Sequence, residues 1–193
     1  KQQPDIAVIA GDIFHQARVW SDRGLKEQQT AVKFLRELSD VCPVVVMRGT
    51  PNHDSAEQFA TLESTFAGDD SVHIVAEPGV STYYGYRHGK KIQIACVPGF
   101  DRGYYRAKHP GLSKEEENEV FTKAVEDIVM GLKAQCDAGA PTVLVSHFTI
   151  TGCNMESGQT AFFSQFEPVV YPSPLSPADI DLGCFGHIHS PQQ

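Results

Sequence analysis

The sequence lacks several features that mark special classes of protein. No apolar run approaches the roughly 20 residues that a membrane-spanning helix needs, and the first residues carry no apolar segment of a secretion signal. The five cysteines lie far apart and include no CxxC pair, so a disulfide framework and a cysteine zinc site are not expected. We expect a cytoplasmic protein with reduced thiols and no membrane association.

Positive charge is also scarce. The 193 residues carry 16 Lys and Arg against 24 Asp and Glu, which gives a formal net charge of -8. Nucleic-acid binders usually show a basic excess, and this chain shows none. Bound metal ions or further residues of a longer chain can supply positive charge locally, so the acidic balance does not exclude a nucleic-acid substrate.

Short apolar runs bounded by turn residues alternate with stretches of helical periodicity, the pattern of an α/β domain. Because the runs are almost continuously apolar, their strands are expected to be buried on both faces. We expect strands at 6–10, 44–47, 72–75, 92–97, 142–145 and 182–185. We expect helices at 25–38, at 56–66, and from a capping box at 113–116 to about 135.

Two stretches of the chain predict irregular connections. Residues 83–91 predict a hairpin with a glycine turn. Residues 149–177 are rich in Ser, Thr, Gly and Pro, and they predict a long, functional surface loop. No repeat and no linker interrupts the chain, so we expect one domain over 1–193.

Polar side chains follow four of the predicted strands at the point where each strand ends. Taken alone, each cluster is ordinary turn or loop chemistry. In open α/β sheets, however, ligands bind at the carboxyl ends of strands, so four such clusters can converge on one place. The residues that they would bring together are Asp12, Asn52, His147, His187 and His189.

This set combines a carboxylate, an amide and imidazoles, which suits first-row divalent metals such as manganese, iron or zinc. A single carboxylate can bridge two ions, and ions about 3.5–4 Å apart are a recurring device for hydrolysing phosphoesters. The residues therefore predict a two-metal phosphoesterase.

The motifs resemble those of the calcineurin-like metallophosphoesterase superfamily. Its signature is Asp-x-His, Gly-Asp, Gly-Asn-His-Asp/Glu, a lone His and Gly-His-x-His. The last four occur here at 11–12, 52–54, 147 and 186–189. Within the superfamily, the stretches 11–15, 145–152 and 187–192 are similar to DNA-repair exonuclease subunits of the SbcD type. The resemblance implies an α/β sandwich of two mixed β-sheets flanked by helices.

The resemblance also implies a role for each ligand. Two divalent ions, taken to be Mn²⁺, would share Asp12 as their bridge. Asn52, His147 and His187 would complete one of the two metal sites. His189 would belong to the other metal site, together with the Asp and His of the first motif.

Three further residues have roles implied by the same resemblance. His53 would face the scissile phosphate and stabilise the transition state or protonate the leaving oxygen. His15 would lie near that phosphate, although a polar residue at the start of a helix explains it equally well. Asp54 would orient a neighbouring ligand without binding metal itself.

The chain departs from the superfamily pattern in two places. It contains no Asp-x-His, so we expect that motif on a strand upstream of Lys1, and we expect a C-terminal capping domain beyond these residues. Two residues, Thr50 and Pro51, are inserted between Gly49 and Asn52. Because proline fixes φ, the loop is expected to bulge there.

The resemblance implies a metal-dependent DNA exonuclease or endonuclease acting in double-strand-break repair or recombination. DNA would be its substrate, an SbcC-like ATPase subunit its partner, and a homodimer its assembly. Arg102, Tyr105 and Arg106 are candidate DNA contacts because basic and aromatic residues interleave there, although an exposed loop explains them more simply. A phosphatase or a cyclic-nucleotide phosphodiesterase on the same scaffold remains an alternative, as does a non-catalytic scaffold protein.

Overall fold

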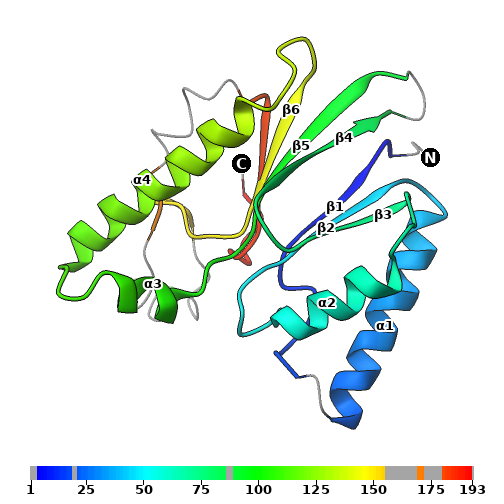
Figure 1. The fold of residues 1–193 in the computed structure, drawn as a ribbon, viewed down its shortest axis with the longest axis horizontal. Coiled ribbons are helices and arrows are strands. Elements are labelled where there is room, and N and C mark those ends of the chain that lie inside the picture. Colours follow the sequence, from blue (N-terminus) through cyan, green and yellow to red (C-terminus); the bar gives the residue numbers. More distant parts are fainter. Residues whose placement is uncertain (1–3, 19–20, 86–88, 155–168, 172–179, 193) are drawn as a thin grey trace.

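Two β-sheets pack face to face, and helices cover their outer faces (Figure 1). The computed structural model describes residues 4–18, 21–85, 89–154, 169–171 and 180–192, without the side chain of Arg102. The first sheet has the order β1 (Ala7–Ala10), β2 (Val44–Met47), β3 (Val72–Val75), and all three strands are parallel. This arrangement confirms the expected α/β sandwich of two sheets, but the first sheet, expected to be mixed, is parallel in all of its described strands.

The second sheet has the order β4 (Gly79–Tyr84), β5 (Lys91–Val97), β6 (Thr142–Ser146), β7 (Leu182–Phe185). Strand β4 runs antiparallel to β5, and β5, β6 and β7 run parallel, so this sheet is mixed. The first sheet carries α1 (Asp22–Ser39) and α2 (Ala56–Thr65), and the second carries α3 (Arg102–Lys108) and α4 (Lys114–Lys133) (Figure 1). None of the helices described is long and apolar enough to cross a membrane.

Apolar side chains fill the three spaces between these four layers. Between the sheets, Met47 of β2 packs with Ile94 of β5 and Val145 of β6. Beneath α1 and α2 the first sheet packs against Leu35 and Phe59. Because β2 is covered on both faces, all four of its residues are buried, as the sequence predicts. Alternate residues of each central strand thus hold a helix on one side and the other sheet on the opposite side.

Local sequence signals place most element boundaries correctly. Strands β2, β3 and β7 have their predicted bounds, and β1, β5 and β6 differ from theirs by one residue. The predicted capping box at α4 is present: Ser113 Oγ accepts from the N–H of Glu116, whose carboxylate accepts from the N–H of Ser113. The predicted hairpin is also present, and it is longer than expected because β4 begins at Gly79.

Two expectations are wrong. Strand β7 is not buried on both faces, since Leu182 is 56% and Phe185 is 38% exposed. It is an edge strand of the second sheet as described, so no further strand covers it. The simpler interpretation of residues 102–108 was an exposed loop, but they form helix α3.

Most of the predicted surface loop 149–177 lies outside the described residues. Within its described ends, Ile150 pairs with Val170, and Val170 is fully buried against α4. The five cysteines are free thiols, of which Cys42 and Cys96 are buried.

Candidate metal centre

Three of the predicted ligands meet where strands of both sheets end. Asp12 lies two residues beyond β1, His147 directly follows β6, and His187 lies two residues beyond β7. Each offers a ligand atom, and these atoms all lie within 4.8 Å of one another. The packing of the two sheets therefore brings together residues from opposite ends of the chain into one group that can hold a metal ion.

The imidazole of His147 is 3% exposed and held in one orientation. Its Nδ1 lies 2.6 Å from the carbonyl oxygen of Ala10, which can only accept, so Nδ1 carries the proton. In the neutral ring Nε2 then carries a lone pair, and this nitrogen lies 3.1 Å from Asp12 Oδ2. Nε2 is buried and makes no well-aligned hydrogen bond with any described residue.

Two acceptors thus face each other in a buried place, an arrangement that requires a cation or a proton between them. Asp12 supplies the negative charge. Burial opposes its ionisation, but the contacts with His147 and Thr50 outweigh burial and lower its pKa to about 2. Burial likewise opposes protonation of His147, and Asp12 outweighs it, so the pKa of His147 is raised. The donor set and its charge fit a divalent metal ion.

The carboxylate of Asp12 is oriented by the loop that follows β2. Thr50 donates to Asp12 Oδ1 from its backbone N–H at 2.8 Å and from its hydroxyl at 3.0 Å. This leaves Oδ2 directed at His147. Sequence reasoning missed Thr50, which it treated only as part of an insertion; a hydroxyl residue between Gly49 and a predicted ligand was the one available signal.

Asp54 joins the two loops that carry the cluster. It is fully buried, and its Oδ2 accepts from the backbone N–H of Asp12 at 2.8 Å and of Gly49 at 2.7 Å. Its Oδ1 accepts from the N–H of Phe14 at 3.2 Å. Burial raises the pKa of Asp54 even though these three donors favour the carboxylate. The side chain is placed to orient Asp12, the kind of role that the resemblance implies for it.

The backbone around the cluster is unusually tight. Asp12 has φ 54° and His187 has φ 81°, left-handed conformations that cost a non-glycine residue roughly 1–2 kcal/mol. A Cβ on Gly186 would overlap the carbonyl oxygen of Ala10 and Nδ1 of His147, and one on Gly49 would overlap Asp12. Only glycine allows the strand ends to approach so closely.

The other predicted site residues lie around this group. His53 is half-buried and close enough to Asp12 to help lower the pKa of its carboxyl. Asn52 is exposed. Its backbone carbonyl oxygen accepts from the backbone N–H of Ala17, so the loop after β2 is hydrogen-bonded to the loop after β1. His15 and His189 are exposed, and His189 lies outside the cluster of three. Their assigned roles stay predictions.

Two of the three candidate DNA contacts have partners within the protein. Arg106 donates to both carboxylate oxygens of Glu117, at 2.8 and 3.4 Å. Tyr105 packs edge-on against Phe121 with ring centroids 5.2 Å apart. The side chain of Arg102 lies outside the described part of the structure. Contact of these three residues with DNA stays a prediction.

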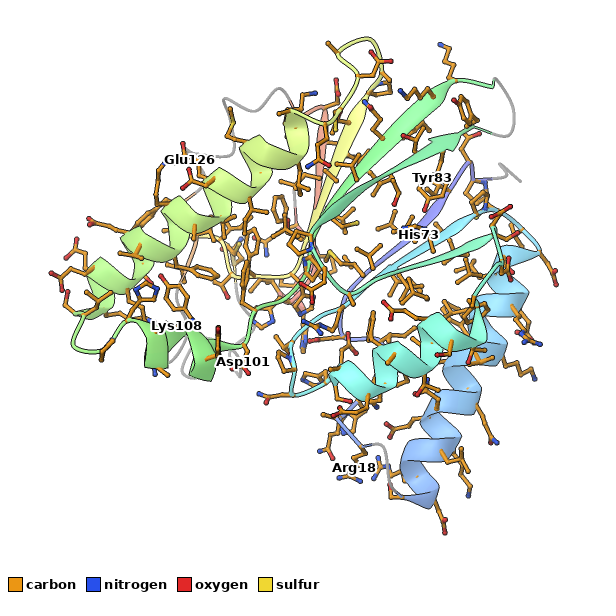
Figure 2. All side chains as sticks on the ribbon, viewed as in Figure 1. Arg18, His73, Tyr83, Asp101, Lys108 and Glu126 are labelled. Carbon is orange, nitrogen blue, oxygen red and sulfur yellow. The ribbon has the colours of Figure 1, made fainter. Side chains whose placement is uncertain are left out.

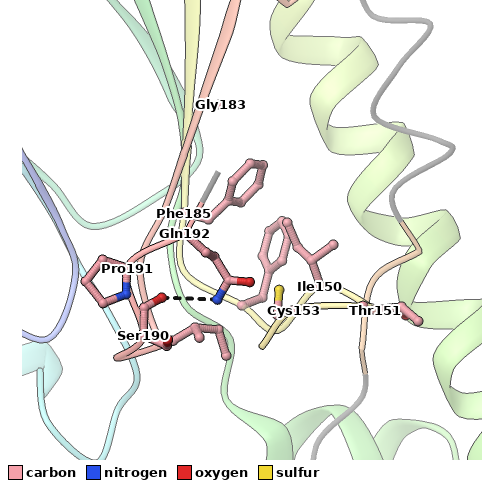
Figure 3. Close-up of a pocket in the computed structure, with 11 residues that line it drawn as sticks. Ile150, Thr151, Cys153, Gly183, Phe185, Ser190, Pro191 and Gln192 are labelled. Atoms are coloured by element: carbon pink, nitrogen blue, oxygen red, sulfur yellow. Dashed lines mark hydrogen bonds between the residues drawn. The ribbon is translucent and has the colours of Figure 1, made fainter. Parts of the chain in front are cut away.

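A cavity of about 560 Å³ lies beside the metal cluster, on the α4 side of the second sheet (Figure 3). Its walls include Phe148 and Ile188, which directly follow the two cluster histidines, and the exposed ring of Phe185. At its rim, Gln192 exchanges hydrogen bonds of 2.8 and 2.9 Å with the backbone of Asn154. The cavity is within the size range of small-molecule sites and is mainly apolar.

Comparison with known proteins shows which family the chain resembles. Residues 1–191 match the model of the calcineurin-like phosphoesterases. Among solved structures, the chain is similar to the phosphopantetheinyl hydrolase PptH from Mycobacterium tuberculosis, with 16% sequence identity and a TM-score of 0.48 over 99% of this chain and 75% of that one. No match is found among curated proteins.

Proposed function

The chain belongs to the calcineurin-like phosphoesterase family, and we propose that this metal-dependent phosphoester hydrolase is a DNA nuclease that cleaves phosphodiester bonds. The observation that carries the metal assignment is a pair of facing acceptors, the buried His147 Nε2 and the partly buried Asp12 Oδ2, 3.1 Å apart. Such a pair needs a cation or a proton between the two acceptors, and a divalent metal ion is the cation that we propose.

Each residue of the cluster has a task in binding. Asp12 is ionised at neutral pH because its pKa is about 2, and Thr50 holds its Oδ1 so that Oδ2 points into the cluster. The Ala10 carbonyl holds His147 with Nε2 facing Asp12. His187 provides the third ligand atom, and Asn52 and His189 are proposed as further ligands. These residues would hold two divalent ions, proposed to be Mn²⁺, which would polarise phosphoryl oxygens and lower the pKa of a bound water.

His53 is proposed as the residue that acts on the phosphoester directly. It is close enough to Asp12 to help lower the pKa of that carboxyl, and it is not among the three clustered ligands. A histidine so placed can donate a proton or hydrogen bond to the leaving oxygen. His15, exposed on the adjoining loop, is proposed to contact the same phosphate.

DNA is proposed as the substrate because three stretches, 11–15, 145–152 and 187–192, are similar to SbcD-type nuclease subunits. The same similarity supports an Asp-x-His motif on an upstream strand, an SbcC-like ATPase partner, a homodimer and a place in DNA repair or recombination. All of these belong to the proposal, since the fold and the metal cluster alone do not select a substrate.

Turnover assays of the full-length protein with Mn²⁺ test the proposal. We expect cleavage of labelled linear DNA, loss of cleavage in Asp12→Ala and His53→Ala, and full activity in His73→Ala. His73 is a matched control because it is exposed on β3 and bonds to Ser81, away from the cluster. Hydrolysis of small phosphomonoesters without DNA cleavage would overturn the nuclease assignment. Unchanged cleavage by Asp12→Ala would overturn the metal assignment.

A further inference from the structure

Helix α3 begins beside the metal cluster. After β5 ends at Val97, the chain packs against the site loop: the N–H of Gly99 donates to the carbonyl of Arg48 at 3.0 Å. A Cβ on Gly99 would overlap the backbone of Gly49, and Gly49 in turn abuts Asp12. Asp101, the N-cap of α3, lies near the centre of the molecule, and Lys108 at its other end lies farther out (Figure 2).

The inner side of α3 is fixed to α4. Tyr105 and Phe100 both pack edge-on against Phe121, with ring centroids 5.2 and 5.0 Å away. Arg106 pairs with Glu117, whose side chain is 8% exposed and also pairs with Lys114 at 3.1 Å. Aromatic packing and a largely buried carboxylate therefore hold the helix in place, which makes its outer side a preformed surface.

The outer side carries an aromatic ring and a cation. Tyr104 is 63% exposed, and Nζ of Lys108 lies 5.0 Å from the centroid of its ring. The two residues are one helical turn apart, so they share a face. Residues 102–114 contain four Lys or Arg and no acidic residue, with Asp101 directly before this stretch and three Glu directly after it. Since Glu117 pairs with Arg106 and Lys114, Lys108 is the described cation on this outer face.

We propose that Tyr104 and Lys108 form a stacking platform for a single-stranded end of the nucleic-acid substrate. The inference rests on the proposed function and names the part of the substrate that is held beside the metal cluster. The segment that leads into α3 contacts the loop that orients Asp12, so nucleotides next to a phosphodiester at the cluster would lie on the side of the molecule where α3 begins. Base stacking on the exposed ring and attraction of a phosphate to Lys108 are the contacts that sequence-independent single-strand binding uses.

The proposed contact uses Tyr104 and Lys108 in place of the predicted Tyr105 and Arg106 on the same helix. Tyr105 and Arg106 face α4, where each has a partner, whereas Tyr104 and Lys108 face outward. Because α3 has its own anchors, removing the Tyr104 ring should leave the metal cluster and the fold intact. The platform can therefore be tested apart from catalysis.

The test uses the full-length protein and compares Tyr104→Ala, Tyr104→Phe and Lys108→Gln with the parent. Binding of a fluorescent single-stranded oligonucleotide is measured by anisotropy, and turnover is measured on the oligonucleotide and on methyl p-nitrophenyl phosphate, a diester without a base. Loss of one stacked base should raise the oligonucleotide Kd and KM of Tyr104→Ala roughly 5- to 100-fold. Tyr104→Phe should stay near the parent, and Lys108→Gln should reduce the salt slope of binding by about 0.7. Turnover of the small diester should not change.

Tyr84→Ala is the matched control. Tyr84 is 66% exposed, and it pairs with Lys91 at the start of β5, the end of the sheet away from the metal cluster. An oligonucleotide Kd of Tyr104→Ala equal to that of Tyr84→Ala would overturn the platform and leave the nuclease proposal standing. If the parent cleaves neither labelled linear DNA nor the oligonucleotide, the proposed function fails and the platform falls with it. Preferred binding of a phosphopeptide over the oligonucleotide would also overturn it.

Discussion

Replacing Asp54 tests how the cluster is held, because this one side chain joins both loops. Asp54→Ala deprives the N–H groups of Asp12, Gly49 and Phe14 of their acceptor in a fully buried place. A buried donor left unsatisfied costs about 1–3 kcal/mol. The carboxylate itself is costly to bury, as its raised pKa shows, and its removal returns part of that cost. We therefore expect Asp54→Ala to lower the free energy of unfolding by about 3–5 kcal/mol.

The variant Asp54→Asn keeps the size and shape of the side chain and changes only the hydrogen bonds that it can make. Its amide oxygen can keep the bonds from Asp12 and Gly49, which both reach Oδ2, but its NH₂ group would face the N–H of Phe14. We expect a loss of only about 1–2 kcal/mol in stability. Because Asp12 is then held less firmly, affinity for Mn²⁺ should fall roughly 10- to 100-fold.

Urea denaturation gives the stability and titration calorimetry gives the Mn²⁺ affinity. A true change in stability shifts the midpoint of denaturation without changing the slope. Asp181→Ala is the control, because Asp181 accepts a single backbone N–H, from Thr142 at 2.7 Å, far from the cluster. Asp181→Ala should lower the free energy of unfolding by about 1 kcal/mol and leave the Mn²⁺ affinity unchanged. Equal destabilisation by Asp54→Ala and Asp181→Ala, with equal metal affinity, would refute the reasoning.

Three further predictions follow from the same contacts. Asp12→Asn keeps the acceptor for Thr50 but removes the charge that faces His147, so calorimetry should detect no Mn²⁺ binding at the cluster; parent-like binding would contradict the ligand assignment. In urea denaturation, Gly186→Ala should lower the free energy of unfolding by at least about 2 kcal/mol, because the new Cβ would overlap Ala10 and His147. Gly131→Ala, in open space within α4, should raise it by about 0.5–1 kcal/mol. Burial opposes ionisation of Glu117, but Arg106 and Lys114 outweigh it and lower its pKa below the usual 4.5. The stability it contributes is therefore present above about pH 4.5 and lost as the pH falls through the lowered pKa, so Glu117→Gln should be less stable than the parent at pH 7 by about 1–3 kcal/mol, and this difference should shrink as the pH falls below 4.5; a constant difference across that range would contradict the pairing.

Local chemistry in the sequence is enough to predict most of the elements. The run Val44–Met47 is buried on both faces because it is apolar throughout, and Ser113 starts α4 because its hydroxyl caps the N–H of Glu116. The placement of polar residues at strand ends also follows from the order of apolar runs and turns. These signals act over a few residues, so they can be read without the fold.

Helix α3 and strand β7 show where local signals end. Residues 102–108 carry no apolar periodicity; their helix depends on Phe121 and Glu117, which belong to another helix. Strand β7 is as apolar as the central strands, but it lies at the edge of the described sheet, and its position in the sheet decides its exposure. Contacts between distant segments set both outcomes.

The candidate metal centre divides in the same way. Residue type and position after a strand were sufficient to nominate Asp12, His147 and His187. The sequence did not show that Thr50 orients Asp12, that Asp54 holds both loops, or that the Ala10 carbonyl turns Nε2 of His147 toward Asp12. Those facts depend on the packing of one sheet against the other, because residues far apart along the chain acquire defined distances and directions only when the sheets meet.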